Sequence, residues 1–295
     1  MARHVLTIDP SYQATEWHLE DAIRELIANA IDSEKRQESK MSLGYSVRNK
    51  TLSIESLGIK LPLKVLLMGQ STARDVEDNI GLFGEGLAMA LKTLALYEGN
   101  GKLEGLTIEN DDEKWTPKLE FDTTWDSWVT AIHTRVIKPR NSFKVIINGI
   151  SFEQWEDIQR LFLDLDPEFN LDEVVKPAQW GYDRILTGES FAGSVYVKGV
   201  FVKSYPDLRY GYDLDMKLNR DRKMVDEWDL RNQLQRLLAS AMEIAPDKFK
   251  RDLVDMITSG ENFEVSRAHW ALTQNSTVAE AVTSSFEDKH GEDAI

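Results

Sequence analysis

The sequence predicts an α+β protein in which helices cover one face of a mixed, largely antiparallel sheet. The first observation is an apolar pattern of helical period over residues 15–36. The second is a glycine-rich turn that leads into an apolar helix over residues 81–97. The third is a series of strand-like runs separated by short polar turns, which cover residues 102–109, 115–122, 128–137 and 144–149. Helices followed by consecutive strands indicate a sandwich with the helices on one side.

Shorter elements complete this first part of the chain. Residues 45–54 contain two short alternating runs around Asn49-Lys50, which predict a β-hairpin. Small, polar and charged residues predict loops over 34–42 and 69–79, and the second loop is expected to be mobile. A strand or arm over residues 4–8 and a helical or buried segment over 63–68 are the remaining elements.

A second unit is predicted to start at residue 151. It opens with a helix over 152–163 and contains a strongly strand-like run over 193–203. A long amphipathic helix over 226–244 places Leu230, Leu234, Leu237, Leu238 and Met242 on one side. Further helices are expected over 249–257 and 277–286. The predicted organisation is therefore a first domain over 1–150, a second α+β domain over 151–258 and a helical, polar segment over 259–295.

Composition narrows the class of protein. The chain has 295 residues, of which 42% are hydrophobic, and this fits a packed globular protein. Fifty acidic against 35 basic residues give a formal charge of −15, which disfavours non-specific nucleic-acid binding. The absence of cysteine excludes disulfides, thiolate metal sites and a cysteine nucleophile. No apolar run reaches the roughly 18 residues of a membrane span, so a cytoplasmic protein without a membrane partner is expected.

Three polar residues share one face of the first predicted helix. Glu25 and Asn29 are four residues apart and Asp32 follows three later, so the three side chains stack on one side. A solvated polar helix face explains any single pair of this kind. A carboxylate and a carboxamide are also the groups that can activate a water and hold a divalent cation.

The glycine-rich turn supplies a complementary feature. Gly81, Gly84 and Gly86 surround Glu85 at the start of the apolar helix. Such a turn allows backbone N–H groups to approach an anion, where the helix dipole favours negative charge. A plain helix entry is the simpler explanation when the turn is considered alone. Lys92, further along this helix, is expected to lie on the surface.

These two segments together resemble the GHKL ATPase superfamily of gyrase, the Hsp-ninety chaperones, sensor histidine kinases and MutL. Residues 25–32 look like its asparagine box and residues 80–87 look like its glycine box, while Ser71-Thr72 is similar to the hydroxyl pair at the start of its ATP lid. The resemblance implies a Bergerat-type sandwich over residues 1–150 and binding of ATP with Mg²⁺. It assigns Asn29 to Mg²⁺ and Glu25 to the role of general base, and it places Asp32 and Glu85 at the nucleotide.

The sequence departs from that superfamily at two places. The usual Asp-x-Gly-x-Gly motif, whose Asp binds adenine, is replaced by a stretch that contains Glu55, Ser56 and Gly58. Either Glu55 or Ser56 takes the place of the Asp, with Gly58 as the surviving glycine. The threonine that starts the last strand is matched by Ser142.

The second unit contains one basic cluster, Arg220, Arg222 and Lys223. In gyrase and MutL a basic residue of the second domain reaches the γ-phosphate, and the resemblance offers this role to the cluster or to Lys198 or Lys203. A solvated charge run before a helix is the alternative.

Two hypotheses of function follow. The first is a slow ATPase that uses closure of the 69–79 loop as a conformational switch, with ATP as ligand and with homodimerisation on ATP binding or a protein partner left open. The second is a catalytically idle module that kept the fold. A histidine kinase is a third and weaker reading, because Glu25 favours hydrolysis.

Overall fold

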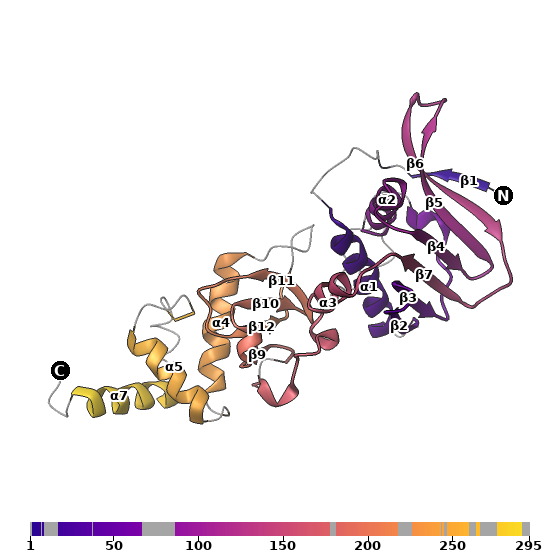
Figure 1. The fold of residues 1–295 in the computed structure, drawn as a ribbon. Helices are drawn as coiled ribbons and strands as arrows, with labels where there is room; N and C mark the ends of the chain where they lie inside the picture. Colours follow the sequence, from indigo (N-terminus) through magenta and orange to yellow (C-terminus); the bar gives the residue numbers. More distant parts are fainter. Residues whose placement is uncertain are drawn as a thin grey trace. The chain divides into compact units, whose positions relative to one another are not determined.

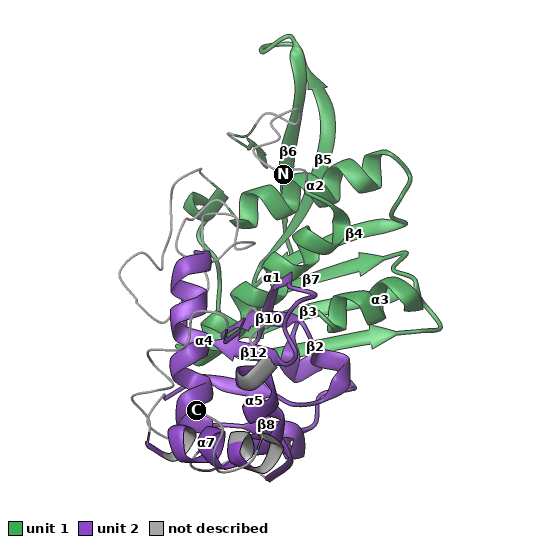
Figure 2. Cartoon of the chain, turned by 90° about the vertical axis from the view of Figure 1, so that its left-hand side faces the viewer, with its two compact units in different colours: residues 1–161 green, residues 162–295 purple. Residues whose placement is uncertain are grey.

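The computed structural model divides the chain into two compact units, residues 1–161 and 162–295 (Figure 2). The residues it describes are 2–6, 8, 17–36, 38–66, 86–177, 181–217, 226–242, 244, 247–259, 264–265 and 276–290. The boundary falls after the helix over 152–159, so the structure groups that helix with the first unit.

Unit 1 is built on an antiparallel sheet. In its described part, seven strands run in the order β1-β6-β5-β4-β7-β3-β2, and each strand pairs antiparallel with its neighbours. The strands are β1 (Ala2–Val5), β2 (Lys40–Ser46), β3 (Thr51–Leu57), β4 (Gly105–Asn110), β5 (Glu113–Asp122), β6 (Ser127–Val136) and β7 (Ser142–Asn148). Helices lie against this sheet in Figure 1, which confirms the predicted α+β class.

Three α-helices accompany the sheet of unit 1 in the described residues. They are α1 (Leu19–Lys35), α2 (Gly86–Gly99) and α3 (Phe152–Gln159), and a single 3-10 turn, η1 (Leu63–Leu66), precedes α2. Helix α1 begins about four residues later than the sequence predicts. His18 is its N-cap, and the His18 N–H donates over 3.0 Å to Oδ2 of Asp21, the third helical residue, which accepts as in a capping box.

Strand alternation defines the inner face of the sheet. Leu52, Ile54 and Ser56 of β3 are buried, whereas Thr51, Ser53 and Glu55 between them are half-buried. The inner face continues through Ile108, Trp115, Val145 and Ile147, all of which are fully buried. Helix α1 closes this core with Ile23 and Ile27, and helix α2 closes it with Ala88, Leu91 and Leu94.

Unit 2 is a smaller α+β unit. Its described strands form a five-stranded sheet in the order β11-β10-β12-β9-β8, with one parallel pair, β10 with β12. The strands are β8 (Val174–Val175), β9 (Arg184–Leu186), β10 (Ser194–Val197), β11 (Val200–Ser204) and β12 (Gly211–Leu214). The run over 193–203 is therefore two strands and not one. Lys198, with φ of 52°, and Gly199, with φ of 83°, make the tight turn between them.

The α-helices described in unit 2 are α4 (Glu227–Ala241), α5 (Asp247–Ser259) and α7 (Ser276–His290), and the 3-10 turns are η2 (Leu163–Leu165), η3 (Leu171–Glu173) and η5 (Glu189–Phe191). Helix α4 packs on the sheet with the apolar face that the sequence predicts. Asp226 caps α4 by accepting from the N–H groups of Trp228 and Asp229. Leu230, Leu234, Leu237, Leu238 and Met242 are all buried in one cluster with the strands.

Candidate functional site

Helix α1 presents the predicted polar residues on its partly buried side. Glu25 is 7% exposed, Asp32 is 3% exposed and Asn29 is half-buried. The Asn29 amide donates from Nδ2 to Glu25 Oε1 over 3.0 Å. Since the NH₂ group makes this bond, Oδ1 is the part of the amide that is able to act as a metal ligand. The Asn29 bond therefore orients the Glu25 carboxylate and directs the amide oxygen elsewhere.

Gly86 brings the second predicted segment to the same place. It is the first residue of α2, and a Cβ atom built on it would lie 1.8 Å from Glu25 Oε1 and 2.3 Å from Glu25 Cδ. A Cβ at this position would force a shift, because real Cβ atoms do not come within 3.0 Å of such neighbours. The Glu25 carboxylate thus lies against Gly86, the first described residue of α2, and the dipole at a helix N-terminus favours an anion.

The buried carboxylate and the helix N-terminus form a chemically defined pair. The structure brings together Glu25, Asn29 and Gly86 from two segments that are more than fifty residues apart in the sequence. Asp32 lies buried on the same helix, one turn beyond Asn29. An amide oxygen beside a carboxylate is a hard oxygen donor set of the kind that Mg²⁺ uses when phosphates complete its shell. The residues present therefore fit a magnesium nucleotide.

Glu55 and Ser142 are not part of this constellation. The alternation of β3 points Glu55 away from the inner face, where its carboxylate accepts from Ser142 Oγ over 2.8 Å and from Lys144 Nζ over 3.0 Å. Burial alone raises the pKa of Glu55, but the hydrogen bonds from Ser142 and Lys144 and the nearby positive charges outweigh it and hold that pKa below the usual 4.5. Glu55 and Ser142 thus stabilise the pairing of β3 with β7, and their contact with a nucleotide stays a prediction.

Ser56, the other candidate at this position, faces the inner side of the sheet and is 7% exposed. Gly58 follows at the end of β3 with φ of 84°, and its N–H donates to the Asn141 carbonyl over 2.7 Å. A Cβ at Gly58 would meet nothing within 4 Å. Its backbone conformation explains the glycine, and no close approach of a ligand is needed to do so.

Several predicted site residues lie outside the residues that the structure describes. They are Ser71, Thr72, Gly81, Gly84 and Glu85 of the first unit, and Arg220, Arg222 and Lys223 of the second. The two other basic candidates of unit 2 have partners within that unit. Lys198 forms an ion pair with Asp215 over 3.1 Å, and the Lys203 ammonium lies 4.8 Å from the centre of the Tyr205 ring.

Lys92 is the residue that sequence reasoning misplaced. It was expected on the surface of α2, but it is 3% exposed. The signal was present in the sequence, because residues 87–96 are apolar around the whole helix except at Lys92 and Thr93. Arg24, the neighbour of Glu25 on α1, is also buried, at 9% exposure. Arg24 and Lys92 are therefore two buried cationic side chains on α1 and α2, the helices that also carry Glu25 and Gly86.

The described residues give one finding on metal binding and one on membrane spanning. They contain no cluster of three or more His, Asp or Glu side chains able to hold a metal ion. A divalent cation at Asn29 would accordingly need oxygens from its ligand. No helix among them has the length and apolar character needed to cross a membrane.

Comparisons with known proteins give distant similarities. No family model matches the sequence. An uncharacterized protein of Mycoplasma pneumoniae is 25% identical over 243 residues, which cover 77% of this chain and 93% of that protein. The ATPase region of Saccharomyces cerevisiae topoisomerase II resembles the chain with a TM-score of 0.43 and 11% identity, over 70% of this chain and 76% of that one. Any assignment of function must therefore come from the chain's own residues.

Proposed function

We propose that the chain binds ATP with Mg²⁺ and hydrolyses it slowly, as proteins of the GHKL type do. The observation that carries this proposal is the contact of Gly86, at the N-terminus of α2, with the Glu25 carboxylate that Asn29 orients. A helix N-terminus, a neutral amide oxygen and a buried carboxylate in one place are suited to phosphate, cation and water respectively.

Glu25, Asn29 and the start of α2 have different roles in the proposed reaction. Glu25 accepts the proton of the attacking water, since a carboxylate fixed by a hydrogen bond is poised as a general base. Asn29 keeps Glu25 in that orientation through Nδ2 and offers Oδ1 to the cation. The N–H groups of the first turn of α2 bind phosphate oxygens. Mg²⁺, when bound, neutralises phosphate charge and thereby favours the displacement.

Calorimetry with a non-hydrolysable ATP analogue, together with a phosphate-release assay, tests these roles. Glu25→Gln is expected to abolish hydrolysis and to leave binding of the analogue within a few-fold, because a base acts mainly in the transition state. Asn29→Ala is expected to weaken Mg²⁺-dependent binding itself. Glu20→Gln, in the first turn of the same helix, is the matched control and should change neither quantity. Equal loss of binding in both site variants would contradict this division of roles.

A catalytically idle nucleotide-binding module is the second candidate. The observation that favours it is the orientation of Glu55, which turns its carboxylate away from the inner face where a base would be recognised. Binding of the analogue without any release of phosphate by the wild-type chain would select this candidate. Absence of binding at roughly 100 μM protein would exclude both.

The proposal also includes a conformational switch, in which residues 69–79 close over the nucleotide. Its support is that these residues are small, polar and charged; they lie outside the described residues. Nucleotide is proposed to order this segment, and a homodimer is proposed to form with it. Hydrogen exchange with and without the analogue tests the first point, since new protection in peptides covering 69–79 is expected. Sedimentation of the same samples tests the second.

A further inference from the structure

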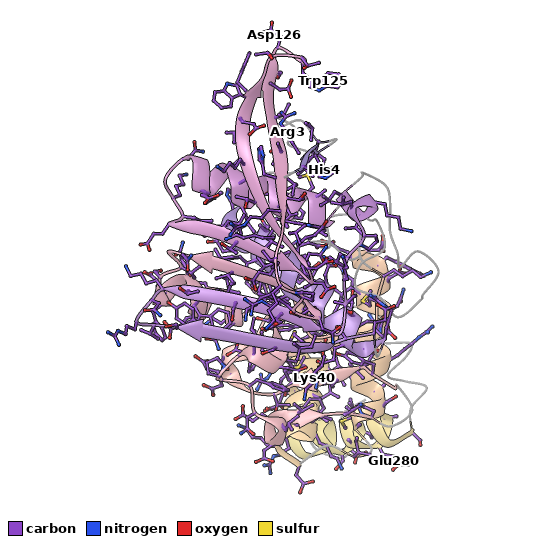
Figure 3. The ribbon with its side chains drawn as sticks, turned by 90° about the vertical axis from the view of Figure 1, so that its right-hand side faces the viewer. Arg3, His4, Lys40, Trp125, Asp126 and Glu280 are labelled. Atoms are coloured by element: carbon purple, nitrogen blue, oxygen red, sulfur yellow. The ribbon has the colours of Figure 1, made fainter. Side chains whose placement is uncertain are left out.

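The hairpin formed by β5 and β6 extends beyond the rest of the sheet (Figure 1). Its strands pair over their full ten-residue length, from Glu113↔Val136 to Asp122↔Ser127. On one side β4 pairs with β5 only as far as Trp115, and on the other side β1 pairs with β6 only as far as Ala131. The half of the hairpin that includes the loop over 123–126 is thus a two-stranded ribbon in the described part of the chain. Trp125 and Asp126 lie at its end (Figure 3).

The end of the hairpin carries three exposed aromatic side chains. Trp125 is 70% exposed, Trp128 is 55% exposed and Phe121 is 50% exposed. Phe121 and Trp128 are directly opposite each other across the strands, and their rings meet edge to face with centroids 6.1 Å apart. Exposed aromatic residues scattered singly are ordinary, but three within eight residues on a projecting ribbon indicate a binding surface.

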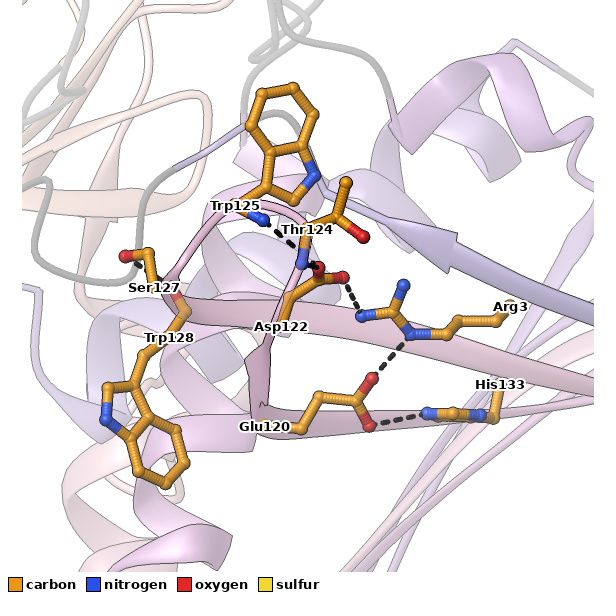
Figure 4. Close-up of polar contacts among 8 residues, drawn as sticks. All are labelled: Arg3, Glu120, Asp122, Thr124, Trp125, Ser127, Trp128 and His133. Atoms are coloured by element: carbon orange, nitrogen blue, oxygen red, sulfur yellow. Dashed lines mark hydrogen bonds and ion pairs between the residues drawn. The ribbon is translucent and has the colours of Figure 1, made fainter.

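Ion pairs and hydrogen bonds connect charged side chains on the opposite face of the ribbon. Arg3 of β1 reaches across β6, where its Nε donates to Glu120 Oε1 over 2.6 Å and its terminal nitrogen pairs with Asp122 (Figure 4). His133 completes the cluster through a 2.8 Å contact with the other oxygen of Glu120. Asp122 also accepts from the N–H groups of Thr124 and Trp125, which fixes the loop. Hydrogen bonds therefore fix the backbone of the loop that carries Trp125, so little backbone entropy is lost when the end of the hairpin binds.

The net charge of the chain favours a cationic partner. The two carboxylates of the opposite face are already paired with cations, and Asp126 at the tip is exposed. The whole chain carries a formal charge of −15, which attracts cationic partners and repels nucleic acid, anionic lipid and a second copy of the chain. Trp125 and Trp128 point away from each other in Figure 4, so the end of the hairpin offers aromatic faces on two sides, with the exposed Asp126 at the tip. Guanidinium groups stack on such faces and pair with a carboxylate.

The accessible area limits the kind of complex. Three aromatic side chains at these exposures offer roughly 400 Å², given 150–250 Å² for each such side chain. A stable dimer needs about 800 Å² on each partner. The hairpin end alone is consequently too small for a permanent dimer and is sufficient for a short segment bound transiently.

We propose that the end of the β5–β6 hairpin, with Phe121, Trp125, Asp126 and Trp128, is a docking surface for an arginine-containing basic segment of a partner protein. This surface is separate from Glu25 and Asn29, so the proposal holds whether or not the chain hydrolyses ATP.

Fluorescence anisotropy with labelled octa-arginine and octa-lysine peptides tests the proposal at roughly physiological 0.15 M salt. Wild-type chain is expected to bind octa-arginine more tightly than octa-lysine, because guanidinium stacks on aromatic rings better than ammonium does. The double variant Trp125→Ala/Trp128→Ala is expected to lose about tenfold in affinity for octa-arginine, the effect of removing two cation–π contacts. Asp126→Asn keeps a residue that tolerates the φ of 48° and should lose about two- to threefold.

Trp228→Ala is the matched control, since Trp228 is 71% exposed in unit 2. It should bind octa-arginine as the wild type does, and circular dichroism should show that all variants keep the fold. The proposal would be overturned if the wild type bound octa-arginine and octa-lysine equally well. It would also be overturned if the double variant bound octa-arginine as tightly as the wild type. Either result would show general attraction of basic peptides to an acidic protein.

Two further measurements test whether the surface instead binds lipid or a second copy of the chain. Sedimentation of the chain with phosphatidylcholine vesicles that depends on Trp125 and Trp128 would assign the surface to lipid. A wild-type dimer that the double variant converts to monomer would assign it to a second copy of the chain. Either result would overturn the proposal.

Discussion

Gly86 leaves no room for a side chain beside Glu25. A methyl group there would overlap the Glu25 carboxylate at 1.8 Å, and the overlap can be relieved only by moving the carboxylate or the start of α2. Gly86→Ala is expected to destabilise the protein by about 1–3 kcal/mol, as overpacked interiors are, in urea denaturation.

The control for this prediction is Gly99→Ala, at the other end of α2. A Cβ there would meet Leu119 at 3.7 Å, which is an ordinary contact, so this variant should be neutral or more stable by up to about 1 kcal/mol. Stability of Gly86→Ala equal to that of the wild type would show that Glu25 does not pack on α2. Restoration of stability in Gly86→Ala/Glu25→Ala would confirm that the two sites are coupled.

A substitution of Ser142 tests the role of the Glu55 carboxylate on the outer face of the sheet. Ser142→Ala removes a hydrogen bond to Glu55 and is expected to cost about 1 kcal/mol at pH 7. The folded-state pKa of Glu55 is held below 4.5, so its contribution is present above the unfolded pKa and is lost as the pH falls through the folded one. The difference between wild type and variant should therefore shrink on going from pH 7 to below pH 4. A difference in unfolding free energy that is independent of pH would refute the role assigned to this bond.

Glu55 and Ser56 show where residue-level prediction stays ambiguous. The sequence identifies a carboxylate near the end of a strand, but the face on which it lies depends on strand register, and a shift of one residue exchanges the two faces. Glu25 and Asn29 did not have this ambiguity, because helical spacing alone places them on one side.

Asn110 connects two elements of unit 1. Its fully buried side chain donates from Nδ2 to the Leu61 carbonyl and accepts from the Leu61 N–H, both over 2.8 Å, so it pairs with that segment as a strand backbone would. Asn110→Ala leaves two backbone groups of Leu61 without these partners and is expected to cost about 1–3 kcal/mol. Thermal unfolding of this variant beside Asn100→Ala, an exposed turn residue, gives the measurement. Equal midpoints would mean that water replaces the Asn110 side chain without loss.

Element boundaries were predicted well where alternation or an apolar face decides them. The strands of unit 1 from β4 to β7 and the helix α4 fall within about three residues of their predicted ranges. The turn inside 193–203 was missed although Gly199 marks it, because the apolar residues before and after Lys198-Gly199 read as one continuous run. The start of α1 was missed because His18 is not a common N-cap residue.

The whole molecule is expected to unfold in two steps, since each unit has a core of its own. Asp213 provides a test in unit 2, where its fully buried carboxylate accepts from Arg184 Nε, Tyr182 Oη and the Gly199 N–H over 2.8–3.0 Å. Asp213→Ala leaves Arg184 without this partner and is expected to cost about 3–5 kcal/mol, the cost of breaking a buried ion pair.

Differential scanning calorimetry measures this change. The transition of unit 2 alone should move to lower temperature, and the exposed Asp207→Ala variant should leave both transitions in place. A single transition that shifts as a whole would show that the two units unfold together.

The positions of the tryptophans have an optical consequence. Trp115 packs edge to face on Phe143 in a fully buried site, and Trp155 stacks on Tyr45, so unit 1 holds indoles shielded from water. Trp125, Trp128 and Trp228 are in contact with solvent. Shielded indoles emit at shorter wavelength and resist collisional quenching by acrylamide. The short-wavelength, quencher-resistant part of the emission therefore includes a signal from the interior of unit 1, and the quenchable part includes the end of the β5–β6 hairpin, so one unlabelled sample reports on both.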